Sequence, residues 1–283
     1  MHLRIVLIAL AVLLAPPAHA ADRWFLTSDG VRLHYTETGR GHTIVLVPGW
    51  TMPAWIFGAQ IADLSRQYRV VAFDPRGQGD SEIASSGYEP VRRGEDIADL
   101  LRVLGPDKPM VAGWSLGALD LLAYVHAHGG ERLAGVVLID NSVGEEQPPP
   151  PEVAEPPRQR HLGVVPREVS VRRFVRGMFL RQLAPSYLER LSEAALRTPA
   201  WAAASLLAYP WPRTYWRDAV YEAGVPVLYL VRPRLAAQAA NLSAHDPDAE
   251  SVVLQGVGHA MFVDDPIRFD GLVRDFIRRK IWP

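Results

Sequence analysis

One serine of this chain stands in a pattern that suits a nucleophile. The pentapeptide Gly113-Trp114-Ser115-Leu116-Gly117 follows a short apolar segment at 109–112 and precedes a helix-like apolar stretch at 118–125. A serine at a sharp strand-to-helix turn presents its hydroxyl above the sheet, and glycines flank it because a Cβ there would collide with neighbouring elements. The helix that begins at this turn also points its first N–H groups at any negative charge that forms nearby. The pattern therefore predicts nucleophilic chemistry at Ser115.

The pentapeptide needs support from its surroundings, because it arises by chance in roughly one chain in ten of this length. From about residue 24, strand and helix signals alternate, which is typical of an α/β domain with a mostly parallel central sheet. The Asp29-Gly30 pair predicts a hairpin between the first two strands. Further strands are expected at 43–47, 68–73, 109–112, 133–140, 225–231 and 251–255.

The alternation stops between the sixth and seventh predicted strands. Residues 145–157 are rich in proline and acidic side chains, as in a linker, and 165–220 hold helical patterns with no strand between them. We therefore expect a helical cap inserted into the sheet domain. The predicted core comprises 21–144 and 221–283, and the predicted cap with its linker comprises 145–220.

Composition narrows the class of protein. The chain has 283 residues, of which 48% are hydrophobic, and a formal net charge of −1, so nothing favours nucleic acid as a partner. Residues 1–20 combine Arg4, an apolar run and the small-x-small triplet 18–20, which is typical of a removable export signal. We expect a periplasmic or secreted protein that begins near Ala21, with no membrane span left after the signal is removed. The chain has no cysteine, which excludes disulfides and thiolate metal sites.

Four landmarks in order give the chain a family resemblance. They are Val47-Pro48-Gly49-Trp50, the run from Phe73 to Ser81, the pentapeptide around Ser115, and Gly256-Val257-Gly258-His259. With these motifs, nearly everything from residue 24 onward resembles the α/β-hydrolase superfamily, in its serine esterase-like branch with a helical cap. The resemblance implies a sheet flanked by helices on both faces and a catalytic triad in the chain order serine, acid, histidine.

The resemblance assigns Ser115 as the nucleophile and His259 as the general base. Many family members carry the acid shortly after the penultimate strand, but residues 231–238 contain no carboxylate here. A second group places it at the end of the preceding strand, which in this chain is Asp140. Asp140 is therefore the predicted acid, needed to orient the imidazole and to stabilise its protonated form. Asp246 and Asp248 remain alternatives, and weaker ones are Glu145 and Glu146.

The same resemblance implies an oxyanion hole made by the backbone N–H groups of Trp50 and Leu116. Aromatic side chains near the turn and in the cap predict an apolar pocket, with Trp114, Phe174 and Trp201 as candidate substrate contacts. Phe179, Trp211 and Trp216 could line it as well, or could simply pack against the core. No metal-binding or nucleotide-binding motif is present, so we expect neither a metal nor an organic cofactor.

These residues predict an exported serine hydrolase that cleaves small to medium hydrophobic carboxylic esters through an acyl-enzyme. Ser115 argues against the epoxide hydrolases and haloalkane dehalogenases of this superfamily, because both use an aspartate nucleophile. Cofactor-free haloperoxidases of the perhydrolase type and hydrolases of carbon–carbon bonds share the triad and stay open as alternatives. So does a ligand-binding protein that keeps the scaffold without catalysis.

Overall fold

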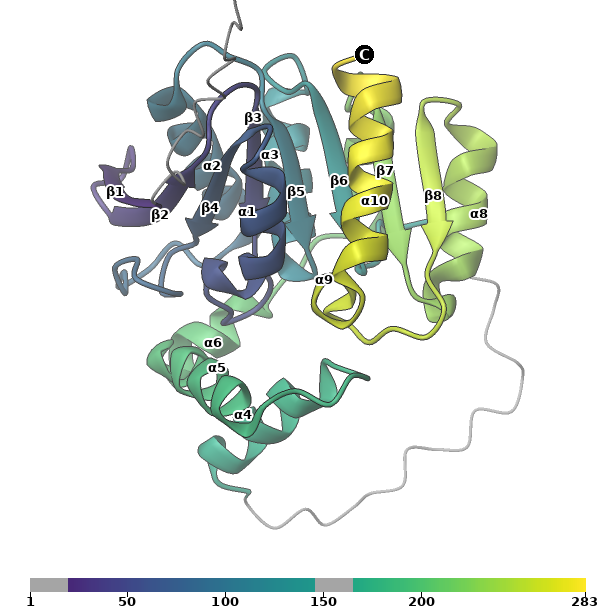
Figure 1. Ribbon diagram of the computed structural model, residues 1–283. Coiled ribbons are helices and arrows are strands. Elements are labelled where there is room, and N and C mark those ends of the chain that lie inside the picture. The colour runs from purple at the N-terminus through teal and green to yellow at the C-terminus, as the bar shows by residue number, and fades with distance from the viewer. Residues whose placement is uncertain (1–19, 146–164) are drawn as a thin grey trace, which may run out of the picture.

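The computed structural model describes residues 20–145 and 165–283, and an eight-stranded sheet forms its centre (Figure 1). The sheet order is β1-β2-β4-β3-β5-β6-β7-β8. β2 pairs antiparallel with β1 and with β4, and all other neighbours are parallel. The strands are β1 (Ala21–Leu26), β2 (Arg32–Thr38), β3 (Thr43–Val47), β4 (Arg69–Asp74), β5 (Met110–Trp114), β6 (Gly135–Ile139), β7 (Val227–Val231) and β8 (Ala249–Val253).

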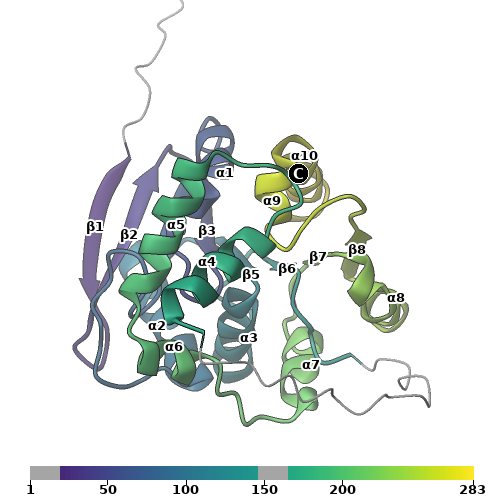
Figure 2. The ribbon, with the colours of Figure 1, turned by 90° about the horizontal axis from the view of Figure 1, so that it is seen from below.

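Helices cover both faces of this sheet, as Figure 2 shows. One face carries α1 (Gly58–Leu64), α9 (Met261–Asp264) and α10 (Pro266–Phe276). The other carries α2 (Pro90–Leu104), α3 (Leu116–His128), α7 (Arg213–Tyr221) and α8 (Ala236–His245). The structure also contains three short helical segments, which are η1 (Ala54–Phe57), η2 (Pro233–Leu235) and η3 (Ile277–Ile281). The expected α/β-hydrolase architecture is confirmed.

The central strands explain why the sheet needs two helical layers. Every residue of β3, β5, β6 and β7 is buried, as in strands covered on both faces. Because side chains alternate along a strand, Val45 and Val111 join the apolar cluster beneath α2 and α3, whereas Ile44 and Met110 join the cluster beneath α1 and α10. The carboxyl ends of the parallel strands then meet at one edge, where functional groups can gather.

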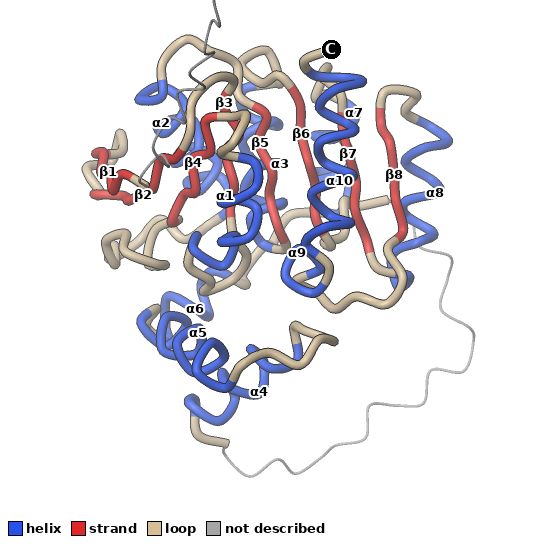
Figure 3. Tube along the Cα trace, viewed as in Figure 1, coloured by secondary structure: helices blue, strands red, loops and turns tan. Residues whose placement is uncertain are grey.

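The cap lies over that edge and consists of α4 (Arg167–Gly177), α5 (Pro185–Arg197) and α6 (Ala200–Leu206). In Figure 3 the loops that follow the strands run between the sheet and this cap. Arg197 and Thr198 bind the cap to the core by donating hydrogen bonds to the carbonyl oxygens of Ser81 and Gly77, at 2.8 and 2.7 Å. The cap is inserted between β6 and β7, as predicted.

The predicted boundary of the cap needs one correction. We expected everything up to residue 220 to belong to the cap, but α7 packs against α3 and contributes Trp216, Ala219 and Val220 to the core.

The predicted export signal and the proline-rich run 148–151 lie outside the described residues. Within residues 20–145 and 165–283, no helix has both the length and the apolar character that crossing a membrane requires.

A buried carboxyl group between α1 and α10 gives the fold a pH dependence. Asp270 accepts a hydrogen bond of 2.9 Å from Gln60 Nε2, while Gln60 Oε1 is buried without a partner among the described residues. Burial raises the pKa of Asp270 to about 6 from 3.8, although the Gln60 hydrogen bond opposes it. Between about pH 4 and 6 the Asp270 carboxyl group is therefore protonated in the folded protein but ionised in the unfolded chain. The free energy of unfolding falls as the pH rises through that window.

We predict that Asp270→Asn stabilises the protein at pH 7.5 by about 1 to 3 kcal/mol, because the amide avoids burying a charge. At pH 4.5 the difference should nearly vanish, since the carboxyl group of Asp270 is then protonated in the folded state. Urea unfolding of the parent and the variant at the two pH values measures this difference in the free energy of unfolding. A variant less stable than the parent at pH 7.5 would contradict this account.

Candidate active site

The turn at Ser115 has the strained geometry that its flanking glycines predict. Ser115 adopts φ 53° and ψ −119°, a conformation that costs a non-glycine residue about 1–3 kcal/mol. A Cβ on Gly113 would lie 2.4 Å from the Gly117 carbonyl oxygen, and a Cβ on Gly117 would lie 2.4 Å from the Val47 carbonyl oxygen. Only glycine fits at either position. The turn thus places Ser115 between the end of β5 and the first turn of α3.

Three residues remote in sequence meet at this turn. His259 Nε2 lies 2.9 Å from Ser115 Oγ, and His259 Nδ1 lies 2.6 Å from Asp140 Oδ2. Because a carboxylate can only accept, Nδ1 carries the hydrogen and Nε2 of the neutral ring can accept the serine proton. The structure thus brings together the three residues predicted as nucleophile, base and acid, in the geometry of a proton-transfer chain.

Asp140 follows β6 directly, and its side chain has no exposed surface. Burial alone would raise the pKa of Asp140, but the hydrogen bond to His259 and the backbone N–H and charge of Arg232 hold it below its usual value. The carboxylate therefore stays ionised beside the imidazole. The residue adopts a positive φ of 47°, and the next residue, Asn141, donates from Nδ2 to the Ser115 carbonyl oxygen at 2.8 Å. One short segment thus orients both the carboxylate that meets His259 and the turn at Ser115.

The alternative acids lie elsewhere. Asp246 follows the last residue of α8, and the carbonyl oxygen of Asp248 accepts from Val227 at the amino end of β7, opposite the edge that carries Ser115. The Glu145 carboxylate accepts a hydrogen bond from the Tyr221 hydroxyl. Glu146 lies outside the described residues. Of the carboxylates considered from the sequence, Asp140 is the one that contacts His259.

The two backbone N–H groups predicted to form an oxyanion hole belong to segments next to Ser115. Gly49 lies against Ser115, because a Cβ on it would be 3.0 Å from Ser115 Cβ. In residues 20–145 and 165–283, no acceptor bonds the N–H of Trp50 or of Leu116, the two predicted donors. Gln78 holds the loop around Trp50: its Oε1 accepts from the N–H of Thr51 at 2.7 Å, and its Nε2 donates to the Gly49 carbonyl oxygen at 3.2 Å.

The predicted substrate contacts divide into three cases. The Phe174 ring meets the Trp50 ring edge-on at 5.0 Å, so it extends from the cap to the loop that follows β3. Trp114 is buried under the histidine loop and donates from Nε1 to the His259 carbonyl oxygen at 2.9 Å, which is a packing role. Trp201 is half-exposed and lines a surface hollow with Tyr88 that includes none of the triad. Phe174 and Trp114 thus lie beside the site, Trp114 with its ring 5.1 Å from the His259 ring, and Trp201 does not.

One carboxylate absent from the sequence prediction ties the histidine loop to the cap. Asp264 on α9 accepts hydrogen bonds from the N–H groups of Gly258, Leu180 and Arg181 at 2.6, 2.9 and 3.0 Å. A Cβ on Gly258 would lie 2.4 Å from the carbonyl oxygen of Met178, so core and cap touch at the residue before His259. The only sequence signal was an acidic residue on the helix that follows the histidine.

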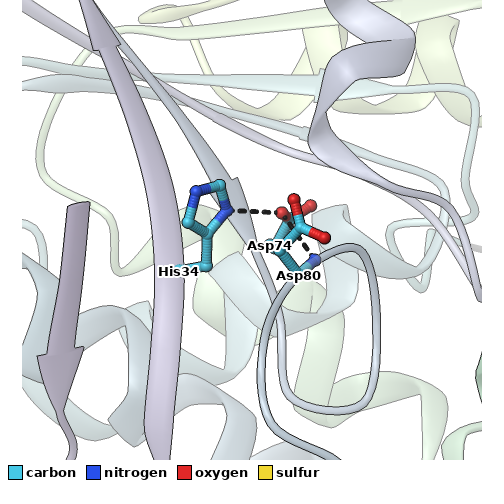
Figure 4. A group of neighbouring side chains, drawn as sticks. All are labelled: His34, Asp74 and Asp80. Atoms are coloured by element: carbon cyan, nitrogen blue, oxygen red, sulfur yellow. Dashed lines mark hydrogen bonds and ion pairs between the residues drawn. The ribbon is translucent and has the colours of Figure 1, made fainter. Parts of the chain in front are cut away.

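One other polar group could in principle hold a metal ion. His34, Asp74 and Asp80 form the one such group in the described part of the chain (Figure 4). However, Asp74 already accepts from His34 Nδ1 and from the N–H groups of Ala54 and Asp80, and His34 Nε2 meets Asp22. Burial lowers the pKa of His34, but these carboxylates outweigh it and raise the pKa above its usual value. These contacts of His34 and Asp74 join β2 to β4.

A family model described as the alpha/beta hydrolase family matches residues 44–270, which include every residue of the site described above. The chain belongs to the alpha/beta hydrolase family. This membership confirms the family that the four sequence landmarks suggested.

Individual members of the alpha/beta hydrolase family are similar to this chain over part or most of its length. A putative aryl esterase from Burkholderia cenocepacia superposes with a TM-score of 0.77 at 25% identity, covering 91% of this chain and 98% of that one. The chloroperoxidase CPO-A1 of Kitasatospora aureofaciens, described as non-heme, is 33% identical over 114 residues, which are 40% of this chain and 42% of that protein. A soluble epoxide hydrolase from Corynebacterium is 35% identical over 107 residues, or 37% of each. The chain thus spans about two fifths of the length of these curated relatives.

Proposed function

We propose that this protein is a serine hydrolase that cleaves small to medium hydrophobic carboxylic esters. The hydrogen-bonded chain Ser115 Oγ–His259 Nε2 and His259 Nδ1–Asp140 Oδ2 is the observation that carries the proposal, at 2.9 and 2.6 Å. The structural likeness to a putative aryl esterase over 91% of the chain supports the same reaction. Family membership alone would not select it, because members differ in nucleophile and chemistry.

In the proposed mechanism, Ser115 Oγ attacks the ester carbonyl carbon while His259 Nε2 takes its proton. The negative charge that develops on the carbonyl oxygen is stabilised by the N–H groups of Trp50 and Leu116, and each such donor is worth about 10²–10³ in rate. His259 returns the proton to the leaving alcohol, which leaves an acyl group on Ser115. The same imidazole then activates water, which releases the carboxylic acid and restores the serine. Asp140 keeps the ring oriented and balances its charge throughout.

Apolar substrates suit the surroundings of these groups. Trp50 reaches the cap by donating from Nε1 to the Ala203 carbonyl oxygen at 2.8 Å, and its ring meets Phe174 from α4. An acyl or aryl group that reaches the carbonyl-binding position would therefore meet aromatic rings from core and cap. Binding through apolar contact discriminates weakly between homologous chains, so we expect a broad preference with an upper size limit rather than a single substrate.

We predict that a fluorophosphonate probe labels Ser115 and that p-nitrophenyl acetate and butyrate are hydrolysed faster than the dodecanoate. Peptide mass mapping identifies the labelled residue, and a chain-length series of p-nitrophenyl esters gives the preference in kcat/KM. Absence of labelling at Ser115 in the folded protein would refute the proposed nucleophile and would favour a ligand-binding role for the scaffold.

The formation of a peracid is a second candidate reaction, because one relative is a chloroperoxidase. The similarity to the Kitasatospora chloroperoxidase extends over 40% of the chain, and hydrogen peroxide in place of water would convert the acyl-enzyme into a peracid. Peroxide-dependent halogenation in the presence of a short carboxylic acid tests this activity.

We also propose that the protein is exported, with a mature chain that begins near Ala21, on the basis of the signal-like residues 1–20. The N-terminal sequence of secreted material checks this cleavage site.

A further inference from the structure

The turn after β7 carries two arginines where a triad acid is often found. The residues Val231-Arg232-Pro233-Arg234 replace a carboxylate-bearing turn, and both guanidinium groups approach Asp140 instead. Arg232 Nε donates to Asp140 Oδ2 at 2.6 Å, and the Arg232 backbone N–H donates to Oδ1 at 3.1 Å. Both carboxylate oxygens are therefore bound by one residue.

The same carboxylate oxygen also serves the histidine. Asp140 Oδ2 lies 2.6 Å from His259 Nδ1, so the imidazole and the guanidinium share one acceptor. Arg232 Nη2 lies only 3.4 Å from His259 Nδ1, which places a fixed positive charge beside the ring. The Arg232 side chain is 25% exposed, whereas the Asp140 side chain has no exposed surface, so solvent screens this interaction only in part.

We propose that Arg232 is a positioning residue of the triad, which holds the Asp140 carboxylate in place and withholds part of its negative charge from His259. This inference rests on the proposed function of Ser115, His259 and Asp140. Without Arg232, the whole charge of Asp140 would act on the imidazole and would favour its protonated form. Protonated imidazole cannot take the serine proton, so Arg232 extends the working range of the enzyme toward lower pH.

Other charged groups near the ring do not replace this effect. Arg234 Nη2 lies 3.6 Å from Asp140 Oδ2, but its side chain is 54% exposed, so solvent weakens its influence. Asp264 reaches the histidine loop from α9, where its carboxylate is taken up by three backbone N–H groups. Tyr229 from β7 donates its hydroxyl to the Asn141 carbonyl oxygen, and burial together with Asp140 raises the pKa of that hydroxyl, so it stays neutral.

The test measures the pH dependence of fluorophosphonate labelling at Ser115 and, in parallel, of kcat/KM for p-nitrophenyl acetate. We expect Arg232→Met to move the acid limb of both profiles to higher pH by about 0.5 to 1 pH unit, and Arg232→Lys to restore at least half of that shift. Arg234→Met should move the limb by less than Arg232→Met. Arg102→Met is the matched control, because Arg102 also donates to a buried carboxylate, that of Asp99, at 2.7 Å but far along α2.

An acid limb that stays in place in folded Arg232→Met, or that moves to lower pH, overturns the proposal and leaves Arg232 as a merely structural anchor. If that variant does not fold, Arg232→Gln provides the same comparison, because it removes the charge while keeping a donor. Failure of the proposed function has a different signature: the unsubstituted protein would then not be labelled at Ser115 at any pH.

Discussion

Replacing Ser115 or His259 by alanine should abolish ester hydrolysis almost completely. We expect kcat for a short p-nitrophenyl ester to fall by about 10⁴- to 10⁶-fold in either variant, because each change removes one end of the 2.9 Å proton-transfer contact between Oγ and Nε2. Groups that act as one unit lose their effect together, so the double variant Ser115→Ala/His259→Ala should be no slower than the worse single variant. Initial rates at saturating substrate measure all three.

Matched controls are available on α8, away from the site. Ser243→Ala and His245→Ala remove the same two side-chain types from exposed positions and should leave kcat unchanged within about twofold. Circular dichroism and thermal unfolding verify that each active-site variant keeps its fold. A folded Ser115→Ala protein that retained more than a few per cent of the parent rate would require another nucleophile.

The family and the serine–histidine pair could be predicted from the sequence because their signals are local. The glycines around Ser115 are required because a Cβ on either would lie 2.4 Å from a backbone carbonyl oxygen, so the motif itself encodes the turn. The buried β-branched strands and the alternation with helices encode the parallel sheet, and parallel order brings the strand ends of β5 and β6 to one edge. His259 followed from its position after the last strand.

The supporting residues could not be predicted because their roles depend on contacts between distant segments. Gln78 binds the loop around Trp50, 26 to 29 residues away along the chain, and Arg232 binds Asp140 across 92 residues. Nothing in the local pattern around an arginine after a strand indicates that it donates to a carboxylate at the end of the neighbouring strand. The sequence showed only that the usual acid position was empty.

The aromatic residues show the limit of composition as a guide to a pocket. Trp114 stands next to the serine in sequence, but its side chain is buried in the cluster beneath α10, where its ring packs against the His259 ring. Trp201 and Ala203 are close on α6, yet Ala203 accepts from Trp50 while Trp201 packs on Tyr88. The periodicity of the element decides which side chain faces the site, because one position along a strand, or two along a helix, reverses the direction of a side chain.

Asp140→Asn should lower kcat by about 10³- to 10⁴-fold with little change in KM. The side chain of Asp140 is wholly enclosed, so a substrate does not touch it and its effect must pass through His259. An amide at this position can offer only one oxygen, for which Arg232 Nε competes with His259 Nδ1, and it cannot balance the charge of the protonated ring. Steady-state kinetics separate kcat from KM, and labelling of Ser115 should slow in parallel. Asp246→Asn and Asp248→Asn are the controls, and a loss of only a few-fold in Asp140→Asn would contradict the assignment.

Asp140→Glu then separates the charge of the acid from its position. Glutamate keeps the negative charge, but its extra methylene displaces the carboxylate by about 1 Å at a position with no exposed surface, and a shift of that size costs about 10²-fold in a positioned catalytic group. If charge alone mattered, Asp140→Glu would be nearly as active as the parent. Because both carboxylate oxygens are bound by Arg232 while one also holds the imidazole, we expect the glutamate variant to fall between the parent and Asp140→Asn. That order, parent above glutamate above asparagine, requires a carboxylate that is both charged and held in one orientation.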